Sequence, residues 1–271
     1  MQILITNDDG YQAKGIRELA EILSQLGNVN VIAPKLPQSG MAMAVSLGKR
    51  PIAHKILKDY GPGNWEYIDA TPASCVKFAL NYTYPDRKPD VVVCGINHGL
   101  NAATAACYSG TLGAAAEGAL NGIPAIGVSL DAWDKDADFS AVKKYFPSIF
   151  KKLMENYPRE KFGVYYNVNF PAIPAEEVKG IKIGHQGIGK WIKEFNRWEE
   201  IYQDSSPFEA ENDEDFYTIR GEFLDDERNT KDADHYQVLD GWISITANNI
   251  DLTDYSEIQR LNDIGFNQKF K

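Results

Sequence analysis

The sequence predicts an α/β protein built on a mostly parallel sheet. Residues 2–6 and 28–33 are short apolar runs, and between them apolar residues from Ile16 to Leu23 recur at helical spacing. This is the pattern of a strand–helix–strand unit. Residues 90–94 and 125–129 are apolar without polar alternation, as expected of strands that are covered on both faces in a parallel sheet.

The rest of the chain extends this pattern and then departs from it. We expect helices over 111–121 and about 138–156, and strands over 163–170 and 240–246. Residues 191–236 interleave charge with aromatic side chains and show no helical period. This composition favours exposed hairpins that bury one face against a partner, with disorder as the alternative. The aromatic residues are Trp191, Phe195, Trp198, Tyr202, Phe216 and Tyr217.

The bulk composition excludes several classes of partner. The 271 residues carry a net charge of -10, which disfavours a nucleic-acid duplex or an anionic membrane surface. No apolar run approaches the roughly 18–20 residues that span a bilayer. The N-terminal segment has no basic region and does not resemble a signal peptide. Cys75, Cys94 and Cys107 lack the paired spacing of a zinc site and are expected to be reduced thiols, so we expect a cytoplasmic protein.

Polar residues follow three of the predicted strands. They lie in the loops 7–10 (NDDG), 37–40 (PQSG) and 95–101 (GINHGLN). In an open parallel sheet, ligands bind beyond the carboxyl ends of the strands. Adjacent carboxylates at Asp8 and Asp9 repel one another unless a cation or a proton lies between them. With a hydroxyl and an amide oxygen the donor set is all oxygen, which selects Mg²⁺ or Mn²⁺ over zinc.

Each of these loops also has a purely structural interpretation. The Asp8-Asp9-Gly10 segment alone is typical of a turn and a helix cap, Ser39 alone of a loop, and Asn97 and Asn101 of backbone hydrogen bonding. Their joint placement after separate strands favours a site.

A fourth segment, 108–111 (YSGT), immediately precedes the predicted small-residue helix. Free backbone N–H groups, the helix dipole and two hydroxyls form an anion cradle there. An ordinary Ser/Thr N-cap is compatible with this interpretation.

Four blocks together resemble the SurE-type survival-protein nucleotidases. The blocks are ILITNDDG (3–10) followed by Gly15-Ile16, AP…QSG (33–40), GINHGLN (95–101) and YSGTLGAAAEG (108–118). The resemblance runs from residue 1 to about 169 and returns at 241–246. It implies a Rossmann-like, three-layer αβα domain that takes in all of residues 1–271, with 191–236 as an extended C-terminal hairpin arm. It further implies homodimers or homotetramers assembled partly through that arm.

The resemblance also implies an activity. The family hydrolyses nucleoside monophosphates to nucleoside and phosphate with one divalent cation per subunit. Carried onto this sequence, the metal ligands are Asp8, Asp9, Ser39 and Asn97. Three positions depart from the family pattern: Ser74 replaces the usual aspartate after TPA, Cys94 replaces the usual serine before GIN, and SITAN (244–248) replaces SITP. The changes at Ser74 and Ala247 leave nucleoside preference and arm packing open.

We assign mechanistic roles as hypotheses. Asp9 orients or deprotonates the attacking water, while Asp8 acts mainly as a ligand. Phosphate contacts are expected from Asn101, Ser109, Gly110 and Thr111. His98 either protonates the leaving oxygen or is a structural histidine.

Two other functions are weighed against this one. The first is a phosphatase with an aspartyl-phosphate intermediate on Asp8 or Asp9, although the second aspartate expected two residues on is absent. The second is a non-enzymatic phospho-acceptor receiver module, although no lysine ends the strand at 125–129. A dinucleotide-binding protein is excluded because no G-x-G-x-x-G follows the first strand.

Overall fold

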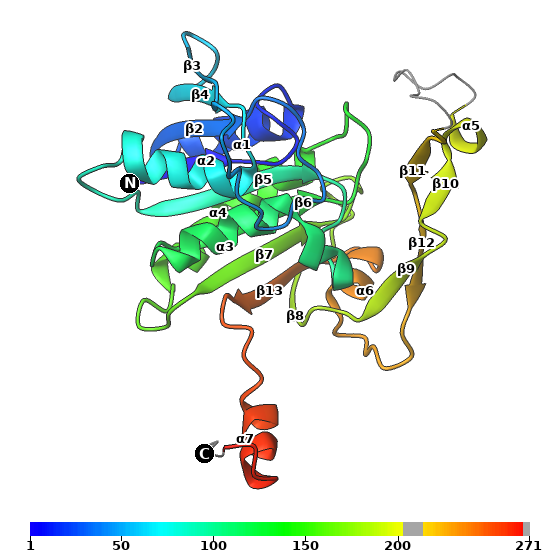
Figure 1. Ribbon diagram of the computed structural model, residues 1–271. Helices are drawn as coiled ribbons and strands as arrows, with labels where there is room; N and C mark the ends of the chain where they lie inside the picture. Colours follow the sequence, from blue (N-terminus) through cyan, green and yellow to red (C-terminus); the bar gives the residue numbers. More distant parts are fainter. Residues whose placement is uncertain (203–213, 268–271) are drawn as a thin grey trace.

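The centre of the protein is a nine-stranded sheet, seen in a computed structural model that describes residues 1–202 and 214–267 (Figure 1). The order across the sheet is β3 (His54–Leu57), β4 (Asn64–Ile68), β2 (Asn28–Pro34), β1 (Gln2–Thr6), β5 (Val91–His98), β6 (Ala125–Leu130), β7 (Val164–Phe170), β13 (Ile243–Asn249) and β8 (Ile181–Gly184). The strands from β4 to β7 in this order are parallel to one another. Only β3 against β4 and β13 against β7 pair antiparallel. The predicted mostly parallel sheet is confirmed.

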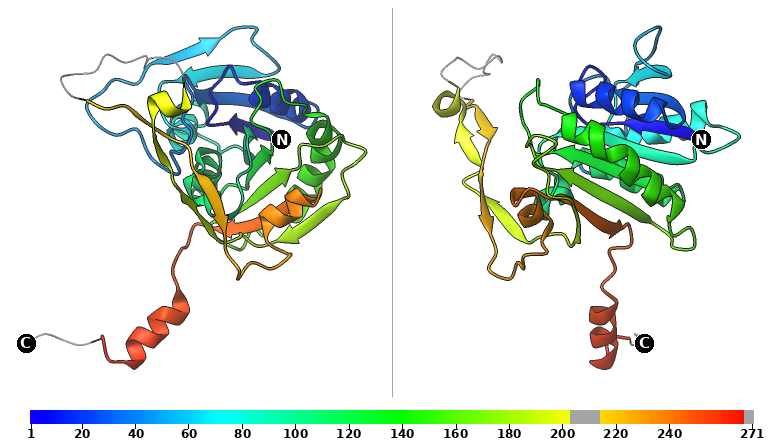
Figure 2. Two further views of the ribbon diagram at one scale, coloured as in Figure 1. Left: turned by 90° about the vertical axis from the view of Figure 1, so that its right-hand side faces the viewer. Right: turned by 180° about the vertical axis from the view of Figure 1, so that it is seen from behind.

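Helices cover both faces of this sheet, which makes the three layers (Figure 2). One face carries α1 (Lys14–Ser24) and α4 (Ser140–Glu155), and the other carries α2 (Pro72–Phe78) and α3 (Gly110–Leu120). Ile3 and Ile5 pack in the core with α1 and α4, whereas Leu4 packs with α2 and α3. Because successive side chains point to opposite faces, the centre of β1 has to be apolar on both faces, as it is at residues 3–5.

The predicted arm is a long two-stranded ribbon that stands apart from the sheet (Figure 1). It contains β9 (Gly189–Ile192), β10 (Phe195–Arg197), α5 (Trp198–Ile201), β11 (Tyr217–Ile219) and β12 (Glu222–Asp225). The antiparallel pairs are β9 with β12 and β10 with β11. Part of the predicted arm, residues 203–213, lies outside the described residues. The last residues of the predicted segment belong to the body of the molecule, because Ala233 and Asp234 are fully buried.

The C-terminal part returns to the sheet and then leaves it. Helix α6 (Asp234–Leu239) leads into β13, and α7 (Tyr255–Asp263) lies well away from the body (Figure 1). Two short irregular helices, η1 (Ala79–Thr83) and η2 (Ala103–Tyr108), complete the elements. The three cysteines are free thiols, with Cys75 and Cys94 buried. No described helix has the length and apolar character required to cross a bilayer.

Candidate functional site

The predicted polar loops meet where the order of the sheet reverses. Strand β1 lies between β2 and β5, and from it the chain builds β2 and β4 on one side and β5, β6 and β7 on the other. The carboxyl ends of β1 and β5 therefore flank the topological switch point, where open α/β sheets bind ligands. Loop 7–10 follows β1 and loop 37–40 follows β2, while 95–98 form the last part of β5 itself.

Asp8 is the most deeply buried carboxylate of the group. Its side chain is 4% exposed, and its Oδ1 accepts a hydrogen bond of 2.6 Å from the hydroxyl of Thr111. Burial, and next the charge of Asp9, raise the pKa of Asp8 from 3.8 to about 6, against the opposing effect of the Thr111 hydrogen bond. The structure thus holds Asp8 in an orientation suited to a charged group while making its ionisation costly.

Asp9 lies beside the end of β5. Its Oδ2 accepts the backbone N–H of His98 at 3.1 Å. Burial raises the pKa of Asp9, and the hydrogen bond from His98 opposes that rise. Both carboxyl groups therefore have raised pKa values.

The imidazole of His98 is held on the outer side of this edge. Its Nδ1 lies 3.0 Å from the carbonyl oxygen of Asp134, and the ring packs edge-on against Phe139. A Cβ at Gly15 of α1 would lie 3.4 Å from Nε2. These contacts favour the structural role for the ring, and the contact that His98 makes with Asp9 comes from its backbone.

Asn97 has an amide oxygen that can serve as a metal ligand. The side chain is 8% exposed, and its Nδ2 donates to the carbonyl oxygen of Gly99 at 2.9 Å. Because the amide nitrogen is engaged, the oxygen points the other way. Asn97 lies on β5, paired with Ser129 of β6, and not in a loop as predicted.

Ser39 lies in an exposed turn that is tied to Asp8. The N–H of Gln38 donates to the carbonyl oxygen of Asp8 at 2.6 Å, which attaches the turn next to the first acidic residue. Gly10 has a φ of +91°, and a Cβ at this position would lie 3.4 Å from the backbone carbon of Leu36 and 3.5 Å from the backbone nitrogen of Pro37. The left-handed conformation favours glycine and keeps the two loops in contact.

The N-terminus of α3 lies directly on Asp8. Ser109 caps the helix, because its Oγ accepts the N–H of Leu112 at 3.1 Å. At Gly110 a Cβ would come within 2.8 Å of the Asp8 Cβ and 2.9 Å of its Oδ2. A side chain at this position would push the carboxylate away, so only glycine allows this close approach. The positive end of an eleven-residue helix thus faces the acidic pair.

This arrangement of donors fits a hard divalent cation. Neither Asp8 nor Asp9 forms an ion pair with a lysine or arginine of the described chain, and the charged side chain that acts on Asp9 is His98. Within the same part of the chain, no three or more His, Cys, Asp and Glu side chains cluster for a metal. A cation here would therefore use two carboxylates and neutral oxygens, the ligand type that Mg²⁺ and Mn²⁺ prefer.

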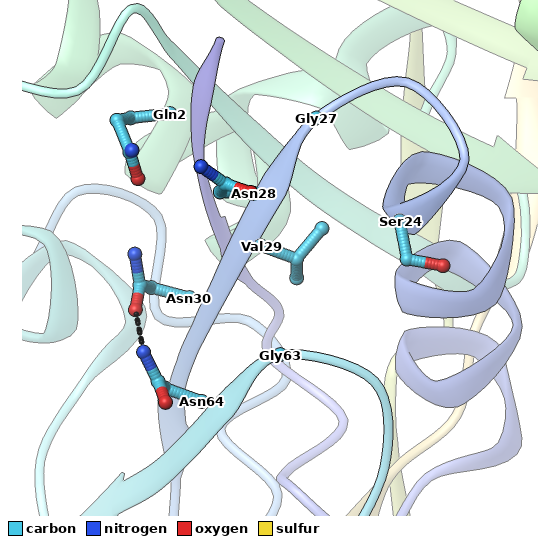
Figure 3. A pocket seen from close by; sticks show the side chains of 8 residues that line it. All are labelled: Gln2, Ser24, Gly27, Asn28, Val29, Asn30, Gly63 and Asn64. Atoms are coloured by element: carbon cyan, nitrogen blue, oxygen red, sulfur yellow. Dashed lines mark hydrogen bonds between the residues drawn. The ribbon is translucent and has the colours of Figure 1, made fainter.

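A separate hollow lies at the opposite edge of the sheet. It is lined by Gln2, Ser24, Gly27, Asn28, Val29, Asn30, Gly63 and Asn64, at the amino ends of β1, β2 and β4 (Figure 3). No charged side chain lines it, and Asn64 donates to Asn30 across it at 2.8 Å. The hollow therefore offers no chemistry comparable to that of the acidic edge.

Comparison with known proteins identifies the family. The family model described as "Survival protein SurE" matches residues 3–193. The chain belongs to the SurE family. A protein of Cytophaga hutchinsonii named 5'-nucleotidase SurE is 38% identical over 261 residues, covering 96% of this chain and 95% of that protein. One of the same name from Bacteroides fragilis is 39% identical over 260 residues, covering 96% and 95%. The crystal structure of SurE protein from Aquifex aeolicus has a TM-score of 0.77 at 32% identity, covering 97% of this chain and 99% of that one.

Within this SurE fold, Asn101 is held by a buried amide network that the sequence analysis missed. Its N–H donates to Asn169 Oδ1 at 3.0 Å, and its carbonyl oxygen accepts from Asn167 at 2.7 Å and from Asn169 at 3.1 Å. Its side-chain nitrogen donates to Ser129 Oγ at 2.9 Å. Asn101 thus contributes mainly by fixing its loop. Two asparagines spaced by two in the apolar strand 164–170 were the available signal, because such spacing puts both on one face.

Ser74, one of the departures from the SurE pattern, supports the loop that follows Ser39. Its hydroxyl accepts the N–H of Ser46 at 2.9 Å and lies 2.8 Å from the Thr71 hydroxyl. The carbonyl oxygen of Ala42 in the same loop lies 1.9 Å from where a Cβ at Gly113 would be. The loop is therefore packed onto α2 and α3, and Ser74 serves as one of its anchors.

Proposed function

We propose that this chain is a divalent-metal-dependent phosphomonoesterase that hydrolyses nucleoside monophosphates to nucleoside and inorganic phosphate. The observation that carries the proposal is the acidic pair at the end of β1, which lies against the N-terminus of α3 and forms no ion pair with a lysine or arginine of the described chain. Such a site needs a cation for its carboxylates and accepts an anion at the helix end. The relatives named 5'-nucleotidase SurE support the nucleotide as substrate.

We assign one Mg²⁺ or Mn²⁺ per subunit to Asp8, Asp9, Ser39 and Asn97. The raised pKa values of both carboxyl groups support this assignment, since a bound cation offsets the cost of their ionisation. When bound, the ion would polarise a phosphate oxygen and lower the pKa of a neighbouring water.

The side chains around the metal would then activate the water, bind the phosphate and transfer protons. Asp9 orients the attacking water or accepts its proton as the new bond to phosphorus forms and the bond to the nucleoside oxygen breaks. Ser109 has its hydroxyl hydrogen free, because its oxygen serves as the cap acceptor, so it can donate to the phosphate. Gly110 contributes the N-terminal backbone of α3, and Thr111 holds Asp8 in place. His98 has its Nε2 left for proton transfer if the ring takes part.

A nucleotide panel assayed with Mg²⁺, Mn²⁺ and EDTA tests the proposal. We expect EDTA to abolish hydrolysis and either cation to restore it. Asp131→Asn is a matched control, because Asp131 directly follows β6 at the same edge and burial also raises its pKa, yet it lies outside the ligand set. Activity that persists after exhaustive chelation would refute the metal mechanism. Capture of fluoroberyllate as an acyl-phosphate mimic would instead support a covalent aspartyl intermediate.

The same proposal includes a homodimer or homotetramer that uses the arm. Phe195, Tyr217 and Ile219 are 70%, 51% and 67% exposed on the ribbon formed by β10 and β11. Large apolar side chains grouped on an extended ribbon are typical of a surface that another subunit covers.

A further inference from the structure

A buried carboxylate outside the acidic edge joins three parts of the chain. Asp234, the first residue of α6, is fully buried. Its Oδ1 accepts three backbone N–H groups, from Ala103 at 2.9 Å, Gly187 at 3.0 Å and His235 at 2.9 Å. Its Oδ2 is buried and has no hydrogen-bond partner in the described part of the chain. Because three backbone N–H groups from separate parts of the chain converge on this one oxygen, Asp234 holds those parts together.

The hydrogen bond from Ala103 holds the segment that leads to Ser109 and the N-terminus of α3, where the phosphate is proposed to bind. Ala103 begins η2, which ends at Tyr108, directly before Ser109. Ala103 has a φ of +48°, a left-handed conformation that is costly for a residue with a Cβ. The surrounding structure has to hold it there, and the bond from its N–H to Asp234 does so. A loss of this bond would release the start of a six-residue segment whose far end directly precedes Ser109, the cap of α3.

The second bond acts on the base of the arm. Gly187 lies two residues before β9, and a Cβ there would come within 2.3 Å of the His235 ring nitrogen Nδ1. The chain is therefore tightly packed against α6 at this point. A second hydrogen bond joins η2 to the base of the arm: the hydroxyl of Thr104 donates to the carbonyl oxygen of Gly189 at 3.0 Å.

We propose that Asp234 is a positioning residue, which sets the geometry of Ser109 to Thr111 through Ala103 and couples that geometry to the base of the arm. The inference rests on the proposed function, in which Ser109 and the backbone of Gly110 bind the phosphate and Thr111 holds Asp8. Asp234 touches neither the acidic pair nor the N-terminus of α3, so its effect is indirect. The bonded oxygen matters as an acceptor, because its three hydrogen bonds all come from backbone N–H groups. The Nδ1 atom of His235 also lies 3.6 Å from this oxygen.

Three variants test this role. Asp234→Ala removes the acceptor and should raise both the KM for a nucleoside monophosphate and the inhibition constant of inorganic phosphate by about tenfold or more, the equivalent of one lost buried hydrogen bond. The affinity for Mn²⁺ should change little, because the metal ligands lie on other segments. Asp234→Asn keeps an oxygen in the same position and should restore most of the phosphate affinity. Asp234→Ser, which reaches fewer of the three N–H groups, should be intermediate and serves if the alanine variant does not fold.

Asp90→Ala is the matched control. The Asp90 carboxylate also accepts a backbone N–H, from Gln2 at 2.7 Å, but at the opposite edge of the sheet. A loss of stability alone should appear in both alanine variants, whereas a weaker affinity for phosphate should appear only at position 234. Unchanged phosphate inhibition in a folded Asp234→Ala or Asp234→Ser protein would overturn the proposal. An asparagine variant as impaired as the alanine variant would overturn the acceptor argument.

Hydrogen exchange separates this inference from the proposed function. Exchange of the amides in 102–111 needs no substrate, and it should accelerate in Asp234→Ala and stay unchanged in Asp90→Ala. If the wild-type protein hydrolyses no nucleotide, the proposed function fails, and the exchange measurement still decides whether Asp234 holds this segment. Exchange at 102–111 that does not respond to the substitution would refute the coupling.

Discussion

Replacing Asp8 by asparagine should stabilise the metal-free protein while abolishing its activity. Asparagine keeps the size of the side chain and an oxygen that accepts the Thr111 hydroxyl, so the local contacts survive. What is lost is a buried carboxyl whose pKa is raised from 3.8 to about 6. That difference corresponds to about 3 kcal/mol of unfavourable ionisation above pH 6. For a chain of 271 residues this equals a shift in Tm of about 5 °C.

The raised pKa of Asp8 determines how the stability difference between the wild type and the variant depends on pH. Below about pH 3.8 the Asp8 carboxyl is protonated in both the folded and the unfolded wild-type chain, so variant and wild type should be equally stable. Between about pH 3.8 and pH 6, the folded wild type loses stability relative to the variant, because the unfolded chain is already ionised at Asp8 while the folded chain is not. Above pH 6 the difference should stay constant.

Thermal unfolding after exhaustive EDTA treatment, scanned from pH 4 to pH 8, measures this difference. Added Mn²⁺ should stabilise the wild type and leave the variant unchanged, because the cation offsets the charge of the ionised pair. The kcat of the variant should fall by about 10³-fold or more. If the metal-free variant is less stable than the wild type at pH 7.5, burial of Asp8 is not the dominant effect and the cation-binding argument loses its basis.

Three further predictions follow from the same geometry. Asp9→Asn should lower kcat by several orders of magnitude with the fold retained, and a variant that keeps more than about a tenth of the wild-type rate would show that the site is misplaced. Gly110→Ala should lower kcat/KM by about tenfold or more, because its Cβ would lie 2.8 Å from that of Asp8; an unchanged kcat/KM would show that this contact is not needed. Replacing 193–221 by Asn-Gly should leave a short hairpin of β9 and β12 and yield smaller assemblies with intact metal binding. Light scattering checks the last prediction, and an unchanged assembly would move the interface to the body of the protein.

The central strands of the sheet could be predicted because their physical signal is local. Strands buried on both faces are mostly apolar, so β1, β2, β5 and β6 were recognisable from their residues. The carboxyl ends of parallel strands meet at one edge, which brought loops 7–10 and 37–40 together with β5. Elements at the border carried weaker signals: β3 has three exposed residues of four, and it was not predicted.

The boundaries failed where tertiary pairing overrode local composition. Strand β5 continues to His98, four residues beyond the predicted end at Cys94, because Asn97 and His98 pair with Ser129 and Leu130 of β6. Polar residues after an apolar run indicate a loop when only the sequence is considered. Here the neighbouring strand supplies the backbone partners that keep the chain extended.

The residues that support the site could not be predicted from the sequence for a different reason. The segment from Gly99 to Ala102 is neither helix nor strand, and only the short helix η2 follows it, so backbone groups here need partners from elsewhere in the chain. Those partners are Asn167 and Asn169 on β7 and Asp234 on α6, which lie 66 to 131 residues away from their partners. A pairing over such a distance leaves no periodicity in the sequence. It does leave a recognisable residue type in the sequence, since amides and carboxylates in otherwise apolar surroundings need hydrogen-bond partners. A buried polar residue in a strand or at a helix start is therefore the feature to examine when a site loop lacks structure of its own.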